Sequence, residues 1–387
     1  MLSKLEQFTN ACVRLEQRGI VVQEERCLRN RHLNSSCQCC LAVCPHEAIH
    51  CGEGLTLLAG KCTGCGACAA VCPGGALVVK LPSNAELCSL ITLHVKHSGA
   101  VAFACEDYLK THPEERQRAI AVHCTARCDE AVLIYAVLQG AAGVSIVNAA
   151  CPDCPQHKLS GLVQSMADTA NRLLAGCNYP AVIAFTREIP AIIKPLPGTG
   201  GAVAGMSRRA FLTAFKNQTA SLLTQVLPEM GVEEADKREE NNVLPNPMGE
   251  AKFLPDKWCS LASSLENLKN TAYSTVIDSK LWGDIAISDN CNGCGVCAEV
   301  CPTAALAIGQ QAGSWSISFH TSRCTQCGLC QDVCCRESIK VHSRVKLGDI
   351  ASRKPRVIIE KKQAEIAAIT ESLDQRMARL LGCVVKS

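Results

Sequence analysis

The chain has 387 residues, of which 29 are cysteine, and it contains only 7 Phe, 3 Trp and 4 Tyr. Its length predicts roughly two or three domains. The formal charge of +3 argues against a nucleic-acid-binding or membrane-surface protein, and no run approaches the ~18 apolar residues that span a bilayer. Residues 1–26 are predicted to form a mixed-charge helix without the apolar stretch of a signal peptide. We therefore expect a cytoplasmic protein whose thiols bind metal.

One cysteine spacing, C-x2-C-x2-C-x3-C, recurs in the segments 27–84 and 288–345. Two-residue gaps let a tight loop wrap three thiolates around one iron–sulfur cube, and the three-residue gap begins a helix that carries the fourth thiolate to another cube. A zinc site needs CxxC pairs a dozen or more residues apart, which these runs lack. The complete runs are Cys62, Cys65, Cys68 and Cys72; Cys291, Cys294, Cys297 and Cys301; and Cys324, Cys327, Cys330 and Cys334.

These runs resemble the bacterial two-cluster ferredoxin family, in which two such runs interleave within one pseudo-symmetric domain. The resemblance implies an α+β ferredoxin-like module with two [4Fe-4S] clusters at each end of the chain. In residues 288–345 it implies a third group of ligands, Cys291, Cys294, Cys297 and Cys334, and a fourth group, Cys301, Cys324, Cys327 and Cys330.

The first run of the segment 27–84 departs from this pattern, because Asn34 stands where the leading cysteine belongs. Three explanations are open: Cys27 completes the site through a loop, the neighbouring Cys39 substitutes, or the site holds a three-iron cluster. We favour Cys27, since the entropy of loop closure grows slowly with length. The predicted ligands are then a first group, Cys27, Cys37, Cys40 and Cys72, and a second group, Cys44, Cys62, Cys65 and Cys68.

Residues 85–196 are predicted to form an α/β domain built on a parallel sheet. Apolar runs at 100–104, 119–122, 143–147 and 181–185 indicate buried strands, and the segments 130–139 and 159–174 indicate helices between them. Five cysteines lie at the ends of these strands or in the loops that follow, namely Cys105, Cys124, Cys128, Cys151 and Cys154. Ligands bind at the carboxyl edge of such a sheet, so a metal site is expected there.

This segment resembles the delta-subunit family of methyl-viologen-reducing hydrogenases, which pass electrons between a hydrogenase and a heterodisulfide reductase. The resemblance rests on Phe103-Ala-Cys105, Val122-His-Cys124 and Cys151-Pro-Asp-Cys154. It implies a [2Fe-2S] cluster on four of the five cysteines. The family's second cysteine after the first strand is missing here, and Cys128 is a candidate to replace it. Zinc at the same thiols, or a set of buried thiols without metal, are the alternatives.

The remaining segments carry weaker signals. Residues 197–287 are predicted to be a linker with helices, and residues 346–387 a helical tail, because apolar residues recur at helical spacing over 356–381. The stretch from Ser207 to Leu212 spells a twin-arginine export motif, but no long apolar stretch follows it, so we interpret it as a helix start.

Together these features predict an iron–sulfur electron-transfer protein, a subunit of an anaerobic oxidoreductase complex of the hydrogenase or heterodisulfide-reductase kind. Its partners would be redox proteins that donate and accept electrons, with no nucleic acid involved. We find no acid–base constellation or nucleotide fingerprint, so no catalytic residues are predicted. The alternatives are a redox enzyme that uses the central cysteines, and a redox-sensing or assembly scaffold.

Overall fold

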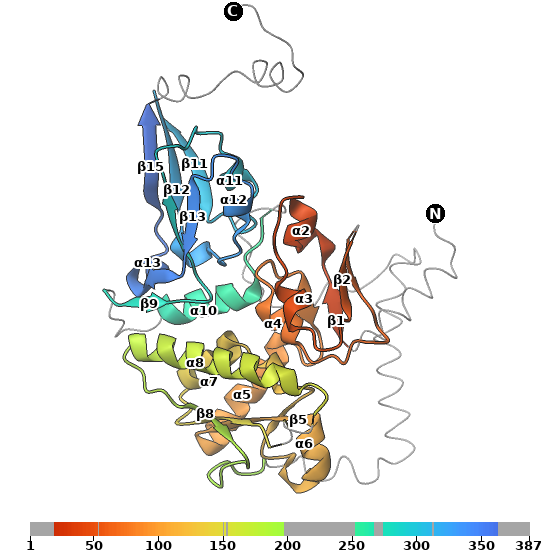
Figure 1. The fold of residues 1–387 in the computed structure, drawn as a ribbon. Coiled ribbons are helices and arrows are strands. Elements are labelled where there is room, and N and C mark those ends of the chain that lie inside the picture. Colours follow the sequence, from red (N-terminus) through yellow and green to blue (C-terminus); the bar gives the residue numbers. More distant parts are fainter. Residues whose placement is uncertain are drawn as a thin grey trace, which may run out of the picture.

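The computed structural model describes residues 19–52, 54–149, 151, 154–196, 252–266, 274–311 and 313–362. They form a first module, a central sheet domain and a second module (Figure 1). Four predictions lie partly or wholly outside the described residues: the N-terminal helix over residues 1–18, the linker over 197–251 and 267–273, the motif Ser207–Leu212, and the tail beyond Lys362. No helix within these described ranges is long and apolar enough to cross a membrane.

Two short antiparallel strand pairs build the first module. Strand β1 (Ile20–Val22) pairs with β4 (Leu77–Val79), and β2 (Ile49–Cys51) pairs with β3 (Leu55–Leu57). The helices of this module are α2 (Leu28–Arg31), α3 (Cys39–Val43) and α4 (Ala67–Val71), with a 3-10 turn η1 (Glu24–Arg26) after β1.

The N-terminal end of this module differs from our prediction, since β1 and η1 lie where residues 1–26 were expected to be helical. Ile20 is buried and Val21 is exposed, which is the alternation that a half-buried strand requires. Pairing with β4, a partner far along the chain, therefore decides the local structure, and the module begins at Ile20 instead of residue 27.

The second module repeats the element order of the first. Strand β10 (Asp284–Ile287) pairs with β13 (Ile339–His342), and β11 (Leu306–Gln311) pairs with β12 (Ser314–Phe319). Its helices α11 (Val296–Glu299) and α12 (Leu329–Asp332) follow the two cysteine loops. Apart from the additional helix α2 in the first module, each module has the order strand, helix, strand, strand, helix, strand, which is the internal pseudo-symmetry expected of a two-cluster ferredoxin.

A third strand, β15 (Arg356–Lys362), pairs with β12 in the second module. The helix predicted over this part of the tail is therefore wrong. Val357, Ile358 and Ile359 are β-branched residues that favour strands, and the edge of β12 offers them backbone partners. Two further elements, β9 (Val276–Asp278) paired with β14 (Arg344–Lys346) and helix α13 (Leu347–Ala351), join this module to the rest.

The central domain is a parallel sheet in the order β6, β5, β7, β8. Its strands are β5 (Val101–Cys105), β6 (Ile120–Val122), β7 (Val144–Val147) and β8 (Ile183–Thr186). Its helices are α5 (Asn84–Ser98), α6 (Glu106–Thr111), α7 (Glu130–Leu138) and α8 (Ser160–Gly176). The predicted parallel sheet is confirmed. From β5 the chain continues to β6, the neighbour on one side of β5, and then crosses to β7, the neighbour on the other side. A topological switch point therefore lies between β5 and β7, and ligands bind at such points.

One hydrophobic core joins all three parts. It contains Ala67 of the first module, much of the central domain, Trp258 of α10 (Asp256–Glu266), and Trp282 beside the second module. Both indoles are buried and hydrogen-bonded, Trp258 Nε1 to Leu281 O at 2.8 Å and Trp282 Nε1 to Ser322 O at 3.2 Å. The three parts therefore pack as one body.

Candidate metal centres

The turn between the second and third cysteine of a run has the same backbone conformation in three runs. Gly66, Gly295 and Gly328 have φ of 81°, 74° and 77°, and each caps the helix that carries the next cysteine. A residue with a Cβ is disfavoured there by roughly 1–2 kcal/mol. In the first run Gln38 takes this position with φ of −134°. The run that lacks its leading cysteine is therefore also the run whose loop has a different shape.

Backbone N–H groups donate to the sulfur that ends three of the four runs. The donors lie four residues further on: Ala48 N to Cys44 Sγ at 3.2 Å, Ala76 N to Cys72 Sγ at 3.3 Å, and Ser338 N to Cys334 Sγ at 3.3 Å. Such bonds favour the thiolate, which is the form that binds iron, and they tune iron–sulfur clusters.

The second and fourth groups each surround a small cavity. Each cavity measures about 20 Å³, and all four predicted ligands of the respective group line it. Burial, and next the Cys327 thiolate, raise the pKa of Cys324 to about 12. Metal binding must displace these protons, as it does wherever thiols become ligands. The donors present fit an iron–sulfur cube in both places.

The third group lies nearest to the protein surface. Burial, followed by the charges of Cys294, Cys291 and Cys334, raises the pKa of Cys297 to about 12, so the four predicted ligands lie within electrostatic range of one another. Cys294 itself is exposed.

The first group is gathered around Cys40. Cys27, Cys40 and Cys72 pack in one hydrophobic cluster. Burial, and then the charges of Cys51, Cys72, Cys37 and Cys27, raise the pKa of Cys40 to about 12. Cys39 is exposed on α3.

Cys51 is a neighbour of this group that the sequence analysis missed. It lies at the end of β2, where Cys40 is its hydrogen-bond partner. Cys51 stands seven residues after Cys44, the last cysteine of its run. The residues at the same distance from the last cysteine of the other three runs are apolar, namely Val79, Ile308 and Val341. Aligning the four runs on their last cysteine would have revealed this thiol.

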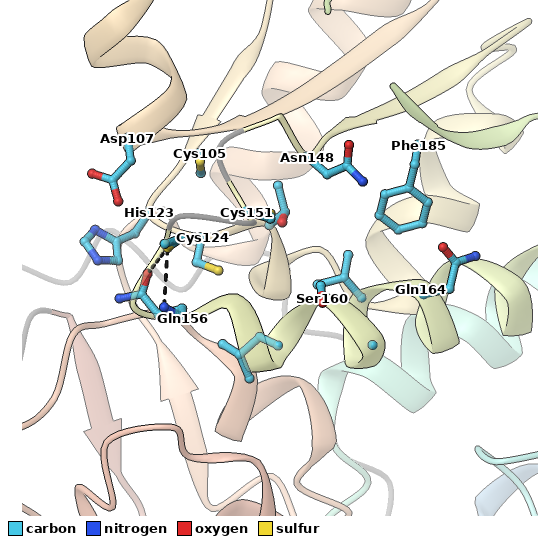
Figure 2. Close-up of a pocket in the computed structure, with 15 residues that line it drawn as sticks. Cys105, Asp107, His123, Cys124, Asn148, Cys151, Gln156, Ser160, Gln164 and Phe185 are labelled. Atoms are coloured by element: carbon cyan, nitrogen blue, oxygen red, sulfur yellow. Dashed lines mark hydrogen bonds between the residues drawn. The ribbon is translucent and has the colours of Figure 1, made fainter. Parts of the chain in front are cut away.

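The central cysteines line a much larger cavity at the carboxyl edge of the sheet (Figure 2). Its volume is about 240 Å³, and its lining includes four thiols, Cys105, Cys124, Cys151 and Cys154. Cys105 ends β5, Cys124 follows β6, and Cys151 follows β7, so the cavity lies at the switch point. Cys128 is not in the lining and is completely buried in the shared core. The structure therefore brings together four of the five candidates.

Polar groups surround these four thiols, which we name the central group. Gln156 N donates to Cys154 Sγ at 3.4 Å. In Figure 2, Asp107 and His123 lie on one side of the thiols, and Asn148 and Gln164 lie on the other. This lining combines thiolate ligands with hydrogen-bonding groups, as a metal–sulfur site or a small-molecule site requires.

Burial is the main cause of the raised thiol pKa values in the central group. Burial and the neighbouring thiolates, in that order, raise the pKa of Cys151 to about 11, and burial raises that of Cys124 to about 12. Within the part of the chain that the structure describes, no three Cys, His, Asp or Glu side chains gather tightly enough to hold a single metal ion.

Comparison with known proteins identifies two segments of the chain. Residues 290–337 match the family model of a 4Fe-4S dicluster domain, and residues 57–78 match that of a 4Fe-4S binding domain. No curated protein and no solved structure matches the chain. The matched segments hold the three complete cysteine runs. The chain therefore contains 4Fe-4S ferredoxin-type domains near both ends, as predicted, and these domains imply an iron–sulfur electron-transfer function.

Proposed function

We propose that the protein binds four [4Fe-4S] clusters, one on each of the first to fourth groups, and passes single electrons between a donor and an acceptor protein. The observation that carries this proposal is the gathering of the predicted cysteine sets, two of them around matching cavities of about 20 Å³. The amide-to-sulfur bonds at the ends of three runs support it further.

For the central group we propose a [2Fe-2S] cluster on Cys105, Cys124, Cys151 and Cys154, with Cys128 as a structural residue. The support is the common cavity of the four thiols and the segment's resemblance to the hydrogenase delta subunit. By the same resemblance, the protein serves in a reducing compartment as a subunit of an oxidoreductase complex, connecting a hydrogenase-like and a heterodisulfide-reductase-like partner.

Anaerobic reconstitution of the full chain tests the cluster count. We expect about 16 iron atoms from four cubes and about 2 from the central group, with matching sulfide. Mössbauer spectroscopy would separate the two cluster types. Bound zinc with no visible absorbance from the central group would contradict the [2Fe-2S] assignment.

The first group has its own test. Cys27→Ala should remove one cube or convert it to a three-iron cluster, whereas Cys39→Ala should leave iron content and EPR spectra unchanged. Cys51→Ala serves as the third variant, because the thiols of Cys51 and Cys40 are hydrogen-bonded. An effect of Cys39→Ala as large as that of Cys27→Ala would overturn the ligand assignment.

A second candidate function is a redox enzyme that acts at the central group. It is favoured by one observation, the cavity of about 240 Å³ beside thiols, which exceeds the cavities of the cube groups about twelvefold. Fast reduction of all clusters by a low-potential donor, and reoxidation by an acceptor protein, would support electron transfer. Substrate-dependent turnover by the isolated protein would support the enzyme instead.

A further inference from the structure

Contacts between the parts of the protein bring thiols of different groups together at defined places. From these contacts we infer that the five groups form one unbranched series in the order central, second, first, fourth, third. The inference rests on the proposed function, because the groups relay electrons only when they hold clusters. It adds to the proposed function the order in which electrons pass the groups, the two places where they cross between domains, and the groups at the two ends of the series.

Within each module, two groups share a hydrophobic cluster. The cluster of the first module combines Cys27, Cys40 and Cys72 of the first group with Cys44, Cys62 and Cys68 of the second. The cluster of the second module combines third-group and fourth-group cysteines in the same way. Cys68 and Cys72 belong to different groups yet are four residues apart, about 6 Å along a helical turn. The second group therefore adjoins the first, and the third adjoins the fourth.

The modules meet at the first and fourth groups. Cys37 and Cys327 pack against the same buried cluster of Leu28, Leu329 and Val333. The three cluster residues between the modules are buried and apolar.

Hydrogen bonds between the two modules also stabilise that interface. Ser36 N and Oγ both donate to Asp332 Oδ2 at 2.8 Å, and Arg31 Nε donates to Val300 O at 3.0 Å. Cys327 of the fourth group packs against the interface cluster and no third-group cysteine does, so we place the third group behind the fourth in the series.

The first module meets the central domain at the second group. Cys65 belongs to the shared core, and Cys124 packs against that core. A Cβ built on Gly66 would lie 3.0 Å from Arg127 Cδ. Helix α4 therefore packs directly on the 3-10 turn η3 (Thr125–Arg127) that follows Cys124.

The two ends of the series differ. One end is the central cavity. The other is the third group, where Cys294 is exposed and Val296 and Ile308 leave 40% and 44% of their surface in solvent. A reduced one-electron carrier protein at one end is oxidised, each reduced cluster passes one electron to its oxidised neighbour, and an oxidised carrier at the other end is reduced.

The order is tested by removing one group at a time from the full chain. Cys40→Ala removes the first group, and Cys68→Ala removes the second. In the dithionite-reduced protein, Cys40→Ala should abolish the spin–spin broadening that the first cluster imposes on the fourth cluster's EPR signal. Cys68→Ala, the matched control in the same module, should leave the fourth signal unchanged. Equal effects of the two variants on the fourth signal, or no effect of Cys40→Ala, would overturn the order.

A second variant keeps the test decisive if removal of a cluster unfolds the module. Asp332→Ala deletes the bonds to Ser36 without touching a ligand, and it should weaken the interaction of the first and fourth clusters at full iron content. Asp278→Ala, an exposed carboxylate on β9, should change nothing. Unchanged coupling in Asp332→Ala would count against the crossing point. Wild-type protein that takes up no iron and sulfide would instead refute the proposed function, so the two failures are distinguishable.

Discussion

A buried ion pair at the junction of the parts yields a quantitative prediction. Lys257 Nζ lies 2.5 Å from Glu130 Oε2, with side-chain exposures of only 10% and 7%. The same ammonium donates to Ala70 O of α4 at 2.8 Å. Lys257→Met would leave the Glu130 carboxylate buried without its counter-charge, since no other donor reaches Oε2 among the described residues.

The cost of this change follows from its burial. Removing one partner of a buried ion pair typically costs about 3–5 kcal/mol, whereas replacing both partners by apolar residues is often neutral. At about 2 °C per kcal/mol, Lys257→Met should lower the apparent melting temperature by about 6–10 °C. The double variant Lys257→Met/Glu130→Leu should recover most of that loss.

The assay is thermal unfolding of the anaerobic, cluster-loaded protein, followed by circular dichroism at one scan rate for all three proteins. If the double variant recovers its melting temperature, the unpaired, buried Glu130 carboxylate is the cause of the lost stability. If the single and double variants melt at the same low temperature, the reasoning is refuted, and the lost bond to Ala70 O becomes the explanation.

Three further predictions concern the ligands and loops. Cys151→Ala should remove the central cluster's iron, whereas Cys128→Ala should keep it; iron analysis distinguishes them, and iron loss in Cys128→Ala would contradict our ligand set. Because burial raises the pKa of Cys151 to about 11, protons compete with metal more strongly as pH falls. A chelator should therefore bleach the central cluster faster at pH 6 than at pH 8, and a pH-independent rate would oppose this. Gly66→Ala should lower the melting temperature, since φ is 81° and its Cβ would meet Arg127 at 3.0 Å, at a cost of about 1–2 kcal/mol. Gly161→Ala, in open space on helix α8, should be neutral or stabilising by up to about 1 kcal/mol, so a similar loss in both variants would argue against backbone strain at Gly66.

The cysteine runs and the parallel sheet could be predicted because their signals are local. Two-residue gaps and the helix after them depend on neighbouring residues, and a buried parallel strand is a short apolar run wherever it packs. Strand β15 shows the opposite case. The sequence of β15 is compatible with the apolar face of a helix or with a strand, because it contains Val357, Ile358 and Ile359. Only the pairing with the edge of β12 determines that it forms a strand.

For the candidate centres, too, local features could be predicted from the sequence, whereas contacts between distant segments could not. The ligand sets within one module are what the ferredoxin resemblance implies for these runs, and they stay a prediction. Cys37 and Cys327 pack against the same buried cluster although they lie far apart in the sequence, so no local pattern indicates this interface. The exclusion of Cys128 likewise depends on burial that the loop sequence does not reveal.

The shared core has a consequence for biosynthesis. The central domain ends near residue 196, but Trp258, Trp282 and Ile350, which complete the same core, emerge later from the ribosome. At ~5–20 residues per second, translation from residue 196 to residue 350 takes roughly 8–30 seconds. During that interval the central domain exposes an apolar face on α7 that α10 later covers. The nascent chain therefore spends its most aggregation-prone period with the first module already synthesised, and early iron–sulfur loading of that module would stabilise the surface on which the second half folds.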